Sequence, residues 1–151
     1  MDTAGRRLTQ NSGPTGQAPT STLTRHYADT SDNPGWVSDP AGAVTRYGES
    51  IGGNLALTID ATTGATTVNL ANPHGDVVTT ANVPADGSAG TSIGGWSDYT
   101  EYGTPRPQSA TPAGTGPLSY GWLGGKQRAT TDTGLTLMGD RYYNPDRKSV
   151  V

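Results

Sequence analysis

Cysteine and phenylalanine are absent from this chain of 151 residues, and aliphatic side chains are scarce. The lack of cysteine excludes disulfides and thiolate metal sites, but it leaves the cellular compartment open. Valine, isoleucine and leucine together make 20 residues, about 13% of the chain, below the roughly 20% that marks disorder in strongly charged chains. The formal net charge is only -3, so disorder does not follow. We expect one domain with a thin core that depends on neighbouring structure.

Long apolar runs and clusters of basic residues are missing as well. No segment approaches the ~18 apolar residues of a membrane-spanning helix. Residues 1–7 lack the apolar region of a secretory signal. The basic pairs at 6–7 and 147–148 lie near opposite ends and form no stripe for phosphate contacts. We therefore expect no membrane span, no nucleic-acid partner and no signal peptide in this chain.

Glycine and proline, by contrast, are abundant, at 22 and 11 residues. Residues 1–24 consist mainly of small and polar residues without any period, which predicts a disordered, flexible leader. Turn signals then recur about every ten residues, and no helical period of useful length is present. Two aromatic and glycine-rich segments, 96–103 and 134–145, are predicted to form short strands closed by turns. Proline after Asn144 should end the second strand, because it has no N–H for the ladder.

The clearest local pattern predicts a hairpin over residues 54–71. Leucine and isoleucine alternate with small residues at 55, 57 and 59, and threonine, valine and leucine alternate at 66, 68 and 70. Gly64 stands late in the intervening loop, where a left-handed residue is favoured. Further turns are predicted at 39–42 and 72–76, and a further strand at 77–80. The sequence thus predicts an all-β array of antiparallel hairpins.

Three patterns invite a catalytic or metal-binding interpretation. Residues 39–42 spell D-P-A-G, but an aspartyl protease needs a second carboxylate that shares a proton, and the expected second D-P is Glu49-Ser50. His74 and Asp76 could form a dyad, but no nucleophile accompanies them in a motif, and His26 is the only other histidine. The glycines at 114 and 116 lack the lysine of a phosphate loop. We predict no enzyme activity, no cofactor, and no catalytic, cofactor-binding or metal-binding residue.

Aromatic side chains are the remaining candidates for a binding surface. They could form a platform for a cell-surface carbohydrate, or fill the gaps between β-layers, which is the commoner role. The residues in question are Trp36, Trp96, Tyr99, Tyr102, Tyr120 and Trp122.

Several motifs together resemble the RHS proteins, which are built from YD repeats. The run L-A-N-P-H-G-D-V-V at 70–78 is similar to their N-x-H-G-D-V-V signature, and Y-T-E-Y-G at 99–103 to the Y-x-x-[FY]-G end of a repeat. Residues 120–125 and 134–145 resemble the C-terminal part of the RHS repeat-associated core, G-L-x-x-M-x-A-R-x-Y-[DN]-P. The resemblance covers roughly residues 25–145, with the motifs in the family's order.

The resemblance implies a β-rich strip that spirals with many other repeats into a hollow shell. In the family this shell encloses a C-terminal toxin or effector, and related repeats occur in insecticidal toxin complexes and teneurins. It implies that the partners are upstream repeats and an effector polypeptide. It also implies that the chain is secreted or lies at the cell surface as part of a larger protein. The expected function is therefore structural: a segment of a wall.

Two departures from the family accompany the resemblance. Asp140 stands where the family has alanine, and residues 146–151 replace the Gly-Arg-Phe and Asp-Pro continuation, so they form an atypical, truncated tail without the self-cleavage motif or the effector. Two alternatives stay open. One is a small carbohydrate-binding module that uses tryptophan and tyrosine. The other is a non-functional, frameshifted gene fragment.

Overall fold

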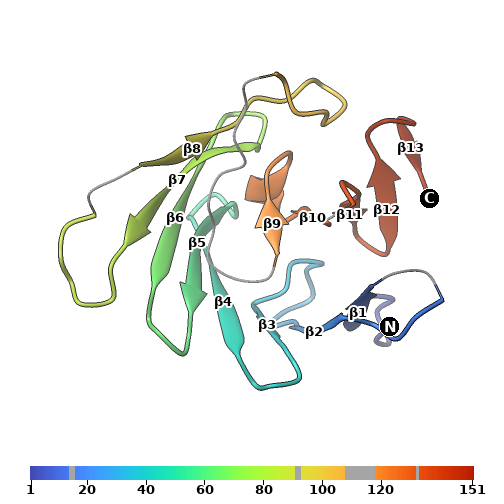
Figure 1. The fold of residues 1–151 in the computed structure, drawn as a ribbon, viewed down its shortest axis with the longest axis horizontal. Coiled ribbons are helices and arrows are strands. Elements are labelled where there is room, and N and C mark those ends of the chain that lie inside the picture. Colours follow the sequence, from blue (N-terminus) through green and yellow to red (C-terminus); the bar gives the residue numbers. More distant parts are fainter. Residues whose placement is uncertain (14–15, 91–92, 108–117, 132) are drawn as a thin grey trace.

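The computed structural model describes residues 1–13, 16–90, 93–107, 118–131 and 133–151, whose strands form two antiparallel sheets (Figure 1). The larger sheet has eight strands in chain order: β1 (Thr9–Ser12), β2 (Ser21–His26), β3 (Trp36–Ser38), β4 (Val44–Glu49), β5 (Leu55–Asp60), β6 (Thr66–Ala71), β7 (Val77–Val83) and β8 (Ile93–Trp96). The smaller sheet has the order β13–β12–β11–β10–β9, from β9 (Ser119–Tyr120), β10 (Ala129–Thr130), β11 (Thr136–Met138), β12 (Arg141–Asn144) and β13 (Ser149–Val150). A 3₁₀ turn, η1 (Gly124–Lys126), follows β9. The predicted all-β fold of antiparallel hairpins is confirmed.

Hairpin follows hairpin through the larger sheet, because each strand pairs with the next one along the chain. The hairpin predicted over 54–71 is present, with Leu57 opposite Val68. Its turn is held by the Asp60 carboxylate, which accepts the backbone N–H groups of Thr62 and Thr63. Gly64 completes it with a φ of 74°, a conformation that glycine adopts without steric cost.

The residues buried on the larger sheet are not those that the simple alternation in the sequence predicts. Directly opposed residues point to the same face, so Tyr47, Thr58 and Thr67 form one row on the inner face. Thr58 and Thr67 are almost completely buried there, and the Asn69 amide donates to the Thr58 hydroxyl at 3.1 Å. Hydrogen bonds between these short side chains let a polar row be buried at low cost.

The outer face of the same sheet carries the apolar side chains that the alternation predicts to be half-buried. Leu57 and Val68 lie opposite each other on this face and are only partly buried, and Leu70, one row further along β6, is 43% exposed. Two register shifts explain why Leu55 and Val77 nevertheless reach the core. The ladder skips a residue after each of them, which turns their side chains to the inner face.

The smaller sheet lies in the hollow of the larger one, which curves round it (Figure 1). Backbone hydrogen bonds join the two, from Val77 N–H to the Gly121 carbonyl at 2.8 Å and from Gly125 N–H to the Gly75 carbonyl at 2.8 Å. The core lies between the sheets and is small: Leu23, Val37, Leu55, Val77, Leu118, Tyr120 and Ala129, with Tyr47 packed against it. Because both sheets contribute, neither has a core of its own.

The predicted flexible leader over 1–24 differs from the structure. Residues 9–12 form β1 and residues 21–24 belong to β2, with Gln10 opposite Leu23. Leu23 is 5% exposed and belongs to the core cluster, and Arg25 N–H bonds to the Leu8 carbonyl. One buried leucine and a backbone ladder order this segment although its sequence has no hydrophobic period.

Residues 146–151, predicted to be an atypical tail, include strand β13. Strand β12 ends at Asn144 as expected, and the Asn144 side chain then accepts the N–H groups of Asp146 and Arg147. The chain returns as β13, with Tyr143 opposite Val150. Asp140 is exposed at the preceding turn, so its charge has no packing cost. The glycines at 114 and 116, considered above for a phosphate loop, lie outside the described residues.

Candidate functional site

The D-P-A-G motif forms an ordinary turn. Gly42 N–H donates to the Asp39 carbonyl at 3.1 Å, and the Asp39 carboxylate accepts Ala43 N–H at 2.9 Å. Glu49, which stands near the position of a second acid, accepts the Gln127 amide at 2.9 Å. Asp39 therefore stabilises its own turn, in agreement with the turn predicted at 39–42, and Glu49 forms a long-range contact.

His74 and Asp76 do meet, at 3.0 Å between Nδ1 and Oδ1, but the aspartate has a structural environment. Asp76 is 6% exposed, and Oδ1 also accepts Leu123 N–H at 3.0 Å, while Oδ2 accepts the Asn72 amide at 3.1 Å. Asn72 in turn accepts the N–H groups of Gly75 and Asp76. The 72–76 turn thus fastens β7 to the segment before η1, and it joins the two sheets.

The six candidate aromatic residues do not gather into one platform. Trp36 and Trp96 are 37% and 55% exposed on the larger sheet, but they lie on β3 and β8, with four strands between them. Tyr120 and Trp122 are buried, at 9% and 8%. Tyr120 packs edge-on against Tyr47, and Trp122 against Tyr143 at 5.2 Å between ring centres. For these two residues the gap-filling role between β-layers is confirmed.

Burial at the Tyr47–Tyr120 contact makes stability sensitive to alkaline pH. Burial raises the pKa of Tyr47 to about 12, from 10.0 in the unfolded chain. Since the unfolded state loses this proton first, we expect the free energy of unfolding to fall as pH rises from 10 to about 12, by roughly 3 kcal/mol at most from this group. Urea titrations at pH 8, 10 and 11.5 measure this. Tyr47→Phe should flatten the dependence, and an unchanged slope would contradict the assignment.

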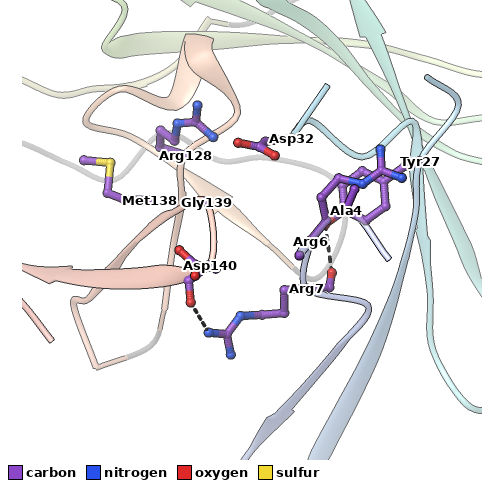
Figure 2. Close-up of a pocket in the computed structure, with 10 residues that line it drawn as sticks. Ala4, Arg6, Arg7, Tyr27, Asp32, Arg128, Met138, Gly139 and Asp140 are labelled. Carbon is purple, nitrogen blue, oxygen red and sulfur yellow. Dashed lines mark hydrogen bonds between the residues drawn. The ribbon is translucent and has the colours of Figure 1, made fainter. Parts of the chain in front are cut away.

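A cavity of about 510 Å³ opens between the N-terminal segment and the β11–β12 turn (Figure 2). Three arginines line it, of which Arg6 pairs with Asp2 at 2.7 Å and Arg7 donates to the Asp140 carbonyl at 2.8 Å. Arg128 faces Asp32 at the other end, and the two form no salt bridge (Figure 2). The cavity is therefore polar and rich in guanidinium groups, which are the side chains best suited to carboxylates and phosphates.

Sequence reasoning missed this cavity. The sequence places Arg6 and Arg7 only in a basic pair near one end of the chain, and no predicted site contains Arg128 or Arg25, which lines an adjoining recess. One signal was present: Arg25 stands two residues after Leu23, so a strand through both places them on the same face. Arg25 is indeed 2% exposed, beside Leu23 in the interior.

Neither a metal cluster nor a membrane helix is found in the described ranges. Within residues 1–13, 16–90, 93–107, 118–131 and 133–151, no three histidine or acidic side chains lie where they could hold a metal ion. No helix there has the length and apolar character to cross a membrane. In comparisons with known proteins, no family model matches the chain, and no curated protein is significantly similar to it.

Proposed function

We propose that this chain is a non-enzymatic structural segment of an RHS-type β-shell that encloses an effector polypeptide. In that role it pairs edge to edge with neighbouring repeats in a larger protein that is secreted or displayed at the cell surface. The motifs at 70–78, 99–103 and 134–145 support the proposal, because two of them hold the strands together. Asn72 and Asp76 of the first join the two sheets. Gly103 of the second packs against Trp122.

The observation that carries the proposal is the β8 edge of the eight-stranded meander, which pairs with no further strand among the described residues. Strand β8 is the last strand of the larger sheet, and its Ile93 and Trp96 side chains are 69% and 55% exposed. An exposed, apolar edge strand is a template for pairing with another strand. A wall segment needs such an edge, whereas a free-standing domain normally protects it.

The accessible surface area of the chain also supports the proposal. Its accessible surface is 8650 Å², whereas a compact monomer of 15.5 kDa exposes about 7,200 Å² by the usual scaling with mass. Exposed apolar side chains on the larger sheet, such as Leu70, Ile93 and Trp96, contribute to this excess of roughly a fifth. Further strands or layers of the same protein would cover part of it.

A lysine on the edge strand tests the proposal. We expect Ile93→Lys to weaken self-association of the chain about tenfold, because a charge on an edge strand opposes pairing. Ile51→Lys is the matched control: Ile51 is fully exposed in the turn between β4 and β5, away from any sheet edge. Sedimentation velocity of both variants measures the effect, and equal association of wild type and Ile93→Lys would contradict the proposed edge.

Tryptophan fluorescence titrated with cell-wall polysaccharides separates the wall segment from a carbohydrate-binding module. We expect no saturable change, since Trp36 and Trp96 lie apart and Trp122 is buried. A saturable change that is lost on replacing an exposed tryptophan would favour the module instead.

A further inference from the structure

Arg25 is a buried positive charge that has no counter-ion among the described residues. It is 2% exposed near the C-terminal end of β2, opposite Val37 on β3. Its Nη2 donates to the Gln10 side chain at 2.6 Å, but Nη1 is buried and has no hydrogen-bond partner. Within the described part of the chain, its guanidinium forms no salt bridge.

The chemistry of arginine makes this arrangement unusual. A buried lysine or histidine can lose its proton, but a guanidinium stays charged in proteins. A charge that is removed from water and left unpaired costs several kcal/mol, so buried charges are normally paired. A neutral amide from Gln10 satisfies one donor and supplies no negative charge. The site therefore favours an anion.

Two adjoining cavities lead to this guanidinium. Arg25 lines a recess of about 10 Å³, room for roughly one oxygen atom or water molecule. The recess shares Tyr27, Asp32, Arg128 and Gly139 with the cavity of about 510 Å³ in Figure 2. Arg128 lies at the boundary of both, and Arg7, whose Nε is buried without a partner, lines the larger one.

We propose that this pair of cavities is a binding site for a carboxylate-bearing ligand. One carboxylate oxygen occupies the recess and accepts from Arg25 Nη1, Arg128 holds the other oxygen at the boundary, and the body of the ligand lies in the larger cavity. A carboxylate is planar and has one further oxygen for Arg128, whereas a phosphate with one oxygen in the recess would have to fit three more at the same boundary. A cavity of this volume accommodates a small molecule or a few residues of peptide. The site does not depend on the proposed wall function.

Equilibrium dialysis of the full chain with labelled succinate tests the site, and it works whatever the association state. We expect saturable binding that Arg25→Gln abolishes and Arg128→Gln weakens about tenfold, the usual effect of removing one charge-assisted contact. Asp32 lines both cavities and repels an anion, so Asp32→Asn should strengthen binding severalfold. Acetyl-Gly-Glu-Gly-amide, as a second ligand, shows whether a free acid or an acidic side chain of a peptide binds more tightly.

Arg46→Gln is the matched control, because Arg46 is exposed on the outer face of the same sheet. It should leave succinate binding unchanged. Circular dichroism shows whether Arg25→Gln folds. If it does not, the difference in succinate binding between Arg128→Gln and Arg46→Gln still tests the site. Absence of saturable binding, equal losses in Arg128→Gln and Arg46→Gln, or equal displacement of succinate by inorganic phosphate would overturn the proposal.

Discussion

Asp76→Ala should lower the free energy of unfolding by about 3 kcal/mol, the combined cost of losing its hydrogen bonds and leaving buried donors unpaired. The carboxylate is 6% exposed and accepts Leu123 N–H and the Asn72 amide, with His74 as a third partner. Leu123 is 47 residues away in sequence, so the loss detaches the segment before η1 from β7.

Urea denaturation followed by tryptophan fluorescence measures this effect, since Trp122 is buried next to the detached segment. Asp76→Asn keeps an oxygen acceptor and should cost less, about 1 kcal/mol. Asp86→Ala is the control for the loss of a turn aspartate: its carboxylate is exposed and bonds to Ser88, two residues away in the same turn. Equal destabilisation by Asp76→Ala and Asp86→Ala would contradict a joining role for the 72–76 turn.

Gly103→Ala should lower the free energy of unfolding by a similar amount, roughly 3 kcal/mol, for two additive reasons. Gly103 has a φ of 85°, where a side chain costs about 1 kcal/mol. An added Cβ would also lie 2.5 Å from Cε3 of the buried Trp122 ring, which must shift. Overpacking of this kind typically costs 1–3 kcal/mol.

Gly87→Ala isolates the conformational part of this cost. Gly87 has a similar φ of 76°, but an added Cβ meets no atom within 4 Å. We expect this substitution to lower the free energy of unfolding by about 1 kcal/mol in the same urea titration. If Gly103→Ala cost no more than Gly87→Ala, the close approach to Trp122 would have no energetic weight.

Local structure could be predicted from the sequence wherever turn chemistry decides it. Gly64 and Asp60 determine the β5–β6 turn, Asp39 and Gly42 the turn before β4, and Asn144 the end of β12. In each case the signal and the hydrogen bonds that it predicts lie within five residues of one another. Short-range information is sufficient there.

The faces of the sheet could not be predicted in this way. The alternation at 55, 57 and 59 favours one buried side, but the register shift beside Leu55 sends Leu57 outward and Thr58 inward. A bulge depends on the partner strand, which a local pattern does not contain. The prediction of a flexible leader over residues 1–24 is wrong for a related reason. The pairing of β1 with β2 and the burial of Leu23 are tertiary contacts, which a local pattern does not contain.

The candidate ligand site could not be predicted from the sequence for the same reason. Arg7, Arg25 and Arg128 are scattered in sequence and come together only when the smaller sheet lies against the larger one. Arg25 also appears ordinary in sequence, since a charged residue in a strand normally faces solvent. Only its burial on the inner face, without a counter-ion, indicates a function.

Sedimentation velocity of the unmodified chain over a hundredfold range of concentration examines the wall-segment proposal most directly. The open edge at β8 and the apolar outer face predict association that increases with concentration, through strands that have no partner within the described chain. A chain that sediments as a monomer at every concentration would contradict the proposal, because its edges would then need no neighbour.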